Sequence, residues 1–258
     1  MDTQLKNLLD YNIEELESIV KAMGQPAFRT KQLWEWLYKG ADFSEMTNLP
    51  EKFRGSLAEN YRSGKLGIKA KLCSKEDDTV KYLFSLGDGN LVESVLMKYK
   101  YGYSACVSTQ VGCKMGCTFC ASTKAGFVRN LTSGEILGQI VTMNADMNIR
   151  IGHVVLMGIG EPLDNYDNVL DFLKKAQSEK GLGISYRNIS LSTCGLAEKV
   201  IKLADEKLPI TLSISLHSPF DEQRSDMMPV NRKYPLDKLL DACNIYTLST
   251  GRRITYEY

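Results

Sequence analysis

The sequence predicts an α/β protein whose main sheet is parallel and curls toward a barrel. One pattern predicts this fold: strand-like and helix-like segments alternate strictly after about residue 99. Such alternation is typical of parallel βα units. The strand-like segments are residues 105–111, 153–159, 188–193, 210–216 and 253–258. Apolar residues at helical spacing lie at residues 136–141, 169–176, 200–204 and 236–243. Four strand–helix units and a fifth strand therefore predict an incomplete barrel.

Three regions are predicted along the chain, at residues 1–55, 56–98 and 99–258. The first is a small helical domain, because the apolar residues of 13–20 and 33–37 recur at helical spacing. The second is a short β segment, because extended residues 79–84 and 91–97 flank a Gly-Asp-Gly-Asn turn. The third is the α/β core.

The composition is that of a globular protein, with 43% hydrophobic and 24% charged residues and a formal net charge of +1. This charge is too small to hold a polyanion by an overall field, so contact with nucleic acid needs local patches. No apolar run approaches the ~20 residues of a spanning helix, and the N-terminus does not resemble a signal peptide. We therefore expect a cytoplasmic protein without membrane contact.

Polar residues recur along one face of the segment 210–216. Thr211, Ser213, Ser215 and His217 share this face, and Asn188, Ser190 and Ser192 repeat the pattern on the preceding strand. Burial of an unpartnered polar group costs about 1–3 kcal/mol, which favours a ligand inside the barrel. The alternative is that the backbone satisfies these hydroxyls.

The chain ends within its last strand-like segment, residues 253–258, with no helix after it. An uncovered parallel edge is a poor end for a domain. We therefore expect the chain to be truncated at its C-terminus.

Three of the seven cysteines lie within eight positions, as Cys113, Cys117 and Cys120. They follow the first core strand, where loops at the carboxyl ends of parallel strands form sites. This grouping favours metal ligation in a reducing compartment over disulfides. Three thiolates suit a [4Fe-4S] cluster with one open iron, because structural zinc usually takes four ligands. The alternatives are a Cys3His zinc site that uses His153 or His217, and free core cysteines.

The Cys-x3-Cys-x2-Cys motif, with an aromatic residue before its last cysteine, resembles the radical S-adenosylmethionine (SAM) superfamily. Further blocks resemble the RlmN/Cfr family of radical SAM RNA methyltransferases, and most of all its RlmN branch. These blocks are residues 106–113, 126–131, 157–162, 215–217 and 224–231. The resemblance covers the chain essentially from end to end, and it implies a partial (βα)6 barrel that is incomplete at the C-terminus.

The resemblance implies that Cys113, Cys117 and Cys120 hold the cluster and that SAM binds its open iron. It places these residues at SAM: Gly160, Glu161, Ser192, Ser215, Leu216 and His217. A glycine permits close backbone approach, and a carboxylate can accept hydrogen bonds from an ammonium group. The alternative for Gly160 and Glu161 is a simple turn before Pro162. Cys73, Cys194 and Cys243 match no family role.

Two further residues match catalytic positions of the family. Cys106 matches the cysteine that resolves a protein–RNA adduct through a transient disulfide, and Glu93 matches the proton acceptor. An exposed strand residue is the alternative for Glu93. If residues 106–112 were fully extended, Cys106 would lie about 20 Å from the cluster loop, at roughly 3.3 Å per residue.

The implied activity is methylation of adenine C2 in 23S rRNA, with a tRNA anticodon-loop adenosine as a second substrate. Family members carry the methyl group on a cysteine near their C-terminus, so we expect the truncated chain to lack full activity. We also expect a monomer that takes electrons from a flavodoxin-type donor. The alternatives are Cfr-type C8 methylation, a non-catalytic iron–sulfur RNA-binding module, and a zinc-stabilised RNA-binding protein.

Local basic patches could contact the RNA. No acidic residue lies between Glu93 and Glu135, where the sequence has Lys98, Lys100, Lys114, Lys124 and Arg129. We expect a phosphate-contacting rim there, with scattered solvated lysines as the alternative. Residues 28–39 interleave aromatic and basic side chains, and the resemblance implies that this region binds RNA, although a packed helix has the same pattern.

Overall fold

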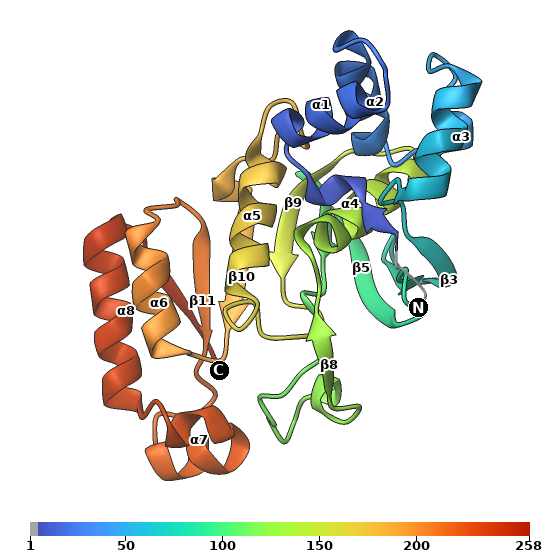
Figure 1. Cartoon of the computed structure of the whole chain (residues 1–258). Coiled ribbons are helices and arrows are strands. Elements are labelled where there is room, and N and C mark those ends of the chain that lie inside the picture. The colour runs from blue at the N-terminus through green and yellow to red at the C-terminus, as the bar shows by residue number, and fades with distance from the viewer. Residues whose placement is uncertain (1–4) are drawn as a thin grey trace.

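A computed structural model describes residues 5–258, and its centre is an eight-stranded mixed sheet (Figure 1). The strand order is β12-β11-β10-β9-β6-β5-β4-β3. These strands are β3 (Gly67–Cys73), β4 (Val80–Ser85), β5 (Leu91–Tyr99), β6 (Gly102–Cys106), β9 (Ile151–Leu156), β10 (Ile189–Thr193), β11 (Thr211–Ser215) and β12 (Ile254–Glu257). β6 and β9–β12 are parallel, whereas β3, β4 and β5 are antiparallel. The predicted open α/β barrel is confirmed, because β12 and β3 remain separate edges of the sheet.

Helices connect the parallel strands and cover one face of the sheet. They are α4 (Ser133–Met147), α5 (Tyr166–Gln177), α6 (Ala197–Asp205), α7 (Asp221–Met227) and α8 (Leu236–Thr250). Figure 1 shows α6 and α8 side by side outside the strands. A capping box of Thr132 and Glu135 starts α4, because each side chain bonds the other's backbone amide. The sequence did not predict α7, since its polar residues have no apolar periodicity.

The parallel strands have one apolar and one polar face. Val154, Leu191 and Leu212 are fully buried on the helix side, whereas Ser192 and Ser215 are half-buried on the open side. The register places Ser192 beside Ser213 and Leu191 beside Leu212, so like faces align. The predicted polar inner face is therefore present.

The segment predicted as one strand over 105–111 is broken, which corrects that prediction. β6 ends at Cys106, and β7 (Gln110–Gly112) pairs with β8 (Phe127–Asn130) in a separate two-stranded sheet. The Ser108 hydroxyl donates to the Glu93 carbonyl of β5 at 2.6 Å, and the Thr109 and Gln110 amides donate to the Ile159 carbonyl, so residues 108–110 remain bonded to β5 and to the loop after β9.

The N-terminal segment packs against α4 and α5. It contains β1 (Lys6–Asn7), α1 (Ile13–Ala22), α2 (Phe28–Tyr38), α3 (Glu51–Asn60) and β2 (Tyr61–Arg62). The Gly134 amide at the start of α4 donates to Asp10 Oδ1 at 2.7 Å, and Lys175 Nζ donates to the Asp10 carbonyl at 2.6 Å. Figure 1 shows α1 and α2 at one end of the molecule and α7 at the other.

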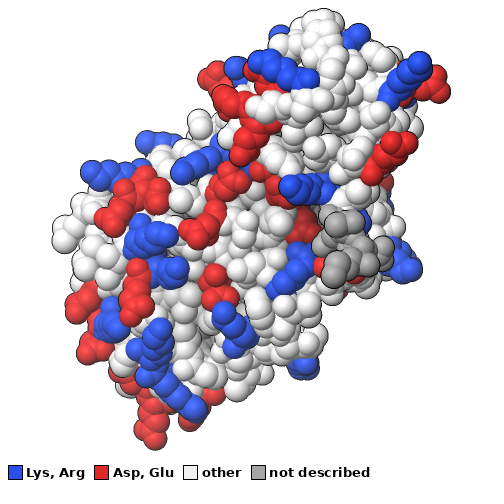
Figure 2. Space-filling model, in the orientation of Figure 1, with Lys and Arg blue, Asp and Glu red and all other residues white. Residues whose placement is uncertain are grey.

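None of the helices within residues 5–258 combines the length and the apolar character that a membrane crossing requires. On the face drawn in Figure 2, acidic and basic side chains are interspersed. That face therefore presents no large field of one sign.

Candidate active site

A cavity of about 280 Å³ lies at the carboxyl ends of the parallel strands. Its wall consists of Cys113, Met115, Cys117, Phe119, Cys120, Thr123, Leu156, Met157, Gly158, Gly160, Glu161, Ser192, Thr193, Cys194, Ser215, Met228 and Glu257. Seven of the sequence-predicted site residues are therefore together in one wall. Leu216 and His217 are not in this wall, as far as the described residues define it.

The loop that carries the three cysteines is tightly folded. Cys113 and Cys117 are buried and Cys120 is half-buried. The Cys120 amide donates to the Cys117 carbonyl at 3.1 Å, and Thr118 donates to the Met227 carbonyl at 2.9 Å, which joins the loop to the end of α7. Burial raises the pKa of the Cys117 thiol to about 11 and also raises the pKa of Cys113. Burial therefore disfavours a bare thiolate, and a cation would make deprotonation favourable.

The Glu161 side chain is only 3% exposed and joins two loops. Its Oε1 accepts from the Leu163 amide at 2.9 Å, and its Oε2 accepts from the Cys194 amide at 2.8 Å. Burial raises the pKa of the carboxyl group. Each carboxylate oxygen has a second lone pair, so the side chain can still accept from a ligand in the cavity.

A glycine is required at position 160 because Gln110 packs closely against it in space. The φ of Gly160 is +110°, and a Cβ at this position would lie 2.6 Å from the Gln110 Cβ. The buried Gln110 amide accepts from the Glu161 backbone N–H at 2.8 Å and donates to Asn130 and Asp164. The close approach expected at this glycine is therefore made by Gln110 of β7.

Glu257 completes the wall, and sequence reasoning missed it. Its Oε2 accepts from the Ser192 hydroxyl at 2.9 Å and from the Ser215 hydroxyl at 3.1 Å, and the two hydroxyls are 3.5 Å apart. The signal was available, because alternation along 253–258 puts Glu257 on the inner face with Thr255.

Leu216 and His217 lie in the loop that follows β11. The Leu216 carbonyl accepts from Arg224 Nε at 3.1 Å, and the Leu216 amide donates to the Glu257 carbonyl at 3.0 Å. His217 has φ +57°, and its ring meets the Phe119 ring edge-on with centroids 4.8 Å apart. Because Phe119 is in the cavity wall, His217 supports that wall from behind.

Comparison with known proteins identifies the family. A family model described as "Radical SAM superfamily" matches residues 107–254, and one described as "Ribosomal RNA large subunit methyltransferase N-terminal domain" matches residues 6–62. The chain is 51% identical over 256 residues to a "Probable dual-specificity RNA methyltransferase RlmN" of Clostridium perfringens strain SM101, covering 98% of this chain and 74% of the relative. The chain belongs to the RlmN family of radical SAM enzymes. It is thus an enzyme of the methyltransferase class.

Two further relatives agree with this assignment. The RlmN relative of Alkaliphilus oremlandii is 52% identical over 253 residues, which is 98% of this chain and 74% of the relative. A crystal structure of a radical SAM methyltransferase from Sphaerobacter thermophilus superimposes with a TM-score of 0.93 at 37% identity, covering 98% of this chain and 76% of that one.

The RlmN family implies a [4Fe-4S] cluster and SAM, and the donor set suits them. Within residues 5–258, no three His, Cys, Asp or Glu side chains converge as one metal ion requires. In a [4Fe-4S] cluster each cysteine binds its own iron, so three separate thiols in one wall are suitable ligands. His153 packs against Tyr101 with ring centroids 4.6 Å apart, and His217 packs against Phe119; no metal-binding group that joins either histidine to the three cysteines is present among residues 5–258.

Cys106 lies at the carboxyl end of β6, on the cavity side of the sheet. The backbone N–H of Met157, a wall residue, donates to its sulfur. Burial raises the pKa of the Cys106 thiol. Glu93 shares this sheet face, because Val95 of β5 pairs with Cys106 and Glu93 is two residues from Val95. Glu93 forms a 2.8 Å ion pair with Lys81 and is 46% exposed.

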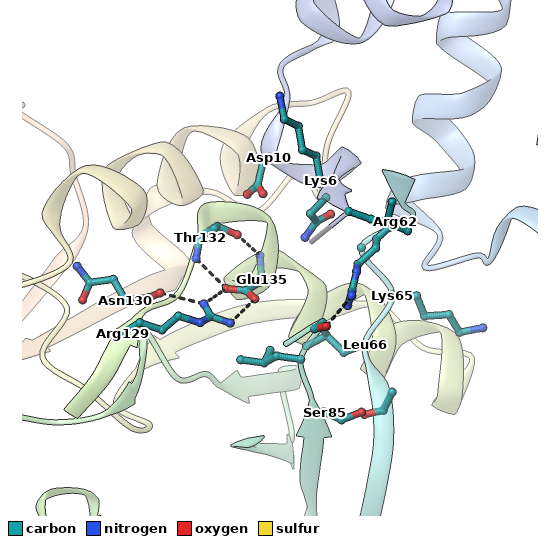
Figure 3. A pocket seen from close by; sticks show the side chains of 16 residues that line it. Lys6, Asp10, Arg62, Lys65, Leu66, Ser85, Arg129, Asn130, Thr132 and Glu135 are labelled. Carbon is teal, nitrogen blue, oxygen red and sulfur yellow. Dashed lines mark hydrogen bonds and ion pairs between the residues drawn. The ribbon is translucent and has the colours of Figure 1, made fainter. Parts of the chain in front are cut away.

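A second cavity, of about 530 Å³, lies between the N-terminal segment and the core (Figure 3). Arg129 donates to both Glu135 oxygens at 2.7 and 2.8 Å and to Asp88 at 2.6 Å, as Figure 3 shows for Glu135. Arg62 donates to the Gly87 carbonyl at 2.5 Å. Arg129 and Glu135 thus form an ion pair within this wall, whereas Arg62 bonds to the backbone.

In the folded chain, ion pairs partly neutralise the expected basic rim. Lys98 pairs with Asp78 at 2.8 Å, Lys114 pairs with Asp164 at 2.9 Å, and Arg129 is bound as described above. These acidic partners come from outside residues 94–134, so the sequence could not show them.

Proposed function

We propose that this chain is the core of a radical SAM enzyme that methylates adenine C2 in 23S rRNA, with a tRNA anticodon-loop adenosine as a second substrate. The observation that carries the proposal is the gathering of three cysteines with Glu161, Ser192 and Ser215 around one cavity at the carboxyl edge of the barrel. The relatives named as dual-specificity RNA methyltransferases support RNA as the substrate. Adenine C2 is a poor nucleophile, which agrees with a radical route.

Cys113, Cys117 and Cys120 would hold the cluster, while Gly160, Glu161, Ser192 and Ser215 would bind and orient SAM. When bound, the cluster and SAM supply one electron and a carbon radical that abstracts hydrogen. A flavodoxin-type protein would supply the electron, and the chain would act as a monomer.

Cys106 and Glu93 would complete the reaction through a cysteine-linked RNA intermediate. Glu93 would accept the proton from the adenine carbon. The Cys106 sulfur would then form a disulfide with the carrier sulfur as the carbon–sulfur bond to the product breaks, and the released methylene carbon would keep that bond's electron pair and take up a proton to become the methyl group. Their common position on one sheet face supports this pairing. We further propose that residues 1–55 form an RNA-binding domain, that residues 56–98 connect it, and that residues 99–258 form the catalytic core.

Anaerobic incubation of the reconstituted chain with SAM, a reductant and a 23S rRNA fragment tests the proposal. SAM should be cleaved, and mass spectrometry should find any transferred methyl group at adenine C2, in low yield, since we expect this chain to lack full activity. A methyl group at C8 would establish the Cfr-type alternative. Absence of SAM cleavage despite an intact cluster would support a non-catalytic iron–sulfur RNA-binding protein, and one zinc without iron or sulfide would support a zinc-stabilised one.

A further inference from the structure

Arg224 of α7 is a fully buried cation directly behind the cavity wall. Its exposed fraction is 0%. Its Nη1 donates to Asn231 Oδ1 at 2.7 Å, and its Nη2 donates to the Cys194 carbonyl at 2.8 Å and to the Ser215 carbonyl at 3.1 Å. Nε also donates to the Leu216 carbonyl, so the hydrogen-bond donors of the guanidinium are well satisfied. Every one of these acceptors is a neutral group.

These bonds connect three parts of the site. Cys194 and Ser215 are wall residues at the ends of β10 and β11. Asn231 belongs to the short 3-10 helix Pro229–Arg232, which directly follows α7. Removal of the guanidinium would release all three parts at once.

The segment that Arg224 anchors supports the cluster loop. The Met227 carbonyl accepts from the Thr118 amide at 2.9 Å, and Met228 is in the cavity wall. A Cβ on Gly116 would lie 3.4 Å from Pro229 Cγ, so the loop and this segment are in direct contact.

The charge of Arg224 has no close counter-ion. No ion pair of Arg224 is present among residues 5–258, and the carboxylate of Asp221 is reached only through Asn231, whose Nδ2 donates to it at 2.8 Å. Isolation of a charge from water costs several kcal/mol unless an opposite charge compensates it. Three thiolates in the adjacent cavity would provide that compensation.

We infer that Arg224 is a positioning residue for the cluster. It holds residues 227–229 against the cluster loop, and its positive charge stabilises the reduced, more negative cluster. This inference rests on the cluster assignment in the proposed function. A nearby cation favours the state with more negative charge, so it raises the reduction potential. The Arg224 charge therefore makes the cluster easier to reduce.

The test compares Arg224→Met, Arg224→Lys and the control Lys175→Met by EPR-monitored dithionite titration of the anaerobically reconstituted chain. Lys175 is a matched control, because it is also buried, at 7% exposure, but bonds to Asp10, Ser133 and Asp171 near the N-terminal segment. We expect Arg224→Met to shift the one-electron equilibrium at least tenfold toward the oxidised cluster, which is about 59 mV. Arg224→Lys should keep most of the wild-type potential, and Lys175→Met all of it.

A potential in Arg224→Met equal to that of the wild type, or an equal shift in Lys175→Met, overturns the inference. If the wild-type chain itself takes up no cluster, the proposed function fails instead. A second measurement covers a variant that binds no cluster: in the metal-free chain, the Thr118 amide should exchange hydrogen at least tenfold faster in Arg224→Met than in Lys175→Met. Equal exchange rates would also overturn the positioning role.

Discussion

Two cavities of this molecule differ in how their polar groups are satisfied. In the cavity of about 530 Å³ between the N-terminal segment and the core, which we call the seam cavity, Arg129 is bound to Glu135 of the same wall and to Asp88. In the smaller cavity of about 280 Å³, buried thiols share the wall with a carboxylate that backbone amides hold in place. The seam cavity contains an ion pair within its own wall, whereas the smaller cavity presents groups suited to a ligand. Chemistry, and not volume, distinguishes the active site.

The strongest test of this comparison removes one thiol. Cys113→Ala, Cys117→Ala or Cys120→Ala should each abolish the iron–sulfur chromophore and lower SAM cleavage at least about 1000-fold, because the cluster that supplies the electron loses a ligand. Absorbance and iron analysis after reconstitution measure the effect. The exposed Cys73 provides the control Cys73→Ala, which should keep full iron content. Full iron content in any of the three variants would contradict the ligand assignment.

A second test strains the start of the cluster loop. Gly112 has φ +71°, and a Cβ there would lie 1.7 Å from the Gly126 carbonyl oxygen. Gly112→Ala should lower the free energy of unfolding by at least about 3 kcal/mol, from left-handed strain and overpacking together. Gly126→Ala is the matched control, because its φ is +73° but nothing lies within 4 Å of its Cβ position.

For Gly126→Ala we expect a loss of only about 1–2 kcal/mol. Urea unfolding of both variants measures the difference. Equal losses would mean that the contact between residues 112 and 126 does not hold the loop.

A third test asks whether SAM uses the hydroxyls of the smaller cavity. Ser215→Ala should raise the Kd for SAM about fivefold, since one hydrogen bond contributes about 1 kcal/mol. Titration calorimetry on the reconstituted chain measures this. Thr211→Val changes the same face of β11 outside the cavity wall, and it should leave the Kd unchanged. Equal effects of the two substitutions on the Kd would contradict the binding of SAM at this wall.

The smallest expected effect concerns the seam. Hydrogen bonding to Arg129 holds the pKa of Asp88 below its usual value of 3.8. The stabilisation is therefore fully present above the unfolded pKa and is lost as the pH falls through the lower folded pKa. Asp88→Asn should cost about 1 kcal/mol of unfolding free energy at pH 7, and the difference should shrink below about pH 4.

Urea unfolding at several pH values measures this difference. Asp88→Asn should not change SAM affinity, because the residue serves only the seam. A lower SAM affinity would show instead that the two cavities are coupled.

Local patterns predicted much of this molecule. Alternation along the strands placed Ser192 and Ser215 on the inner face, and the spacing of the cysteines gave the loop that meets them. The end of β6 at Cys106 could not be predicted, because the pairing of β7 with β8 that follows it joins residues 110–112 to the distant residues 127–130. The burial of Arg224 was equally hidden, since the polar sequence of α7 has the composition of a solvated surface helix.

The position of Glu161 has a mechanical consequence. Its carboxylate fastens the Leu163 and Cys194 amides, so the loops after β9 and β10 form a fixed jaw that cannot spread without breaking buried bonds worth about 1 kcal/mol or more each. The same wall carries Phe119, which is 56% exposed. A ligand of this cavity would therefore meet a rigid wall at Glu161 and an exposed aromatic side chain at Phe119.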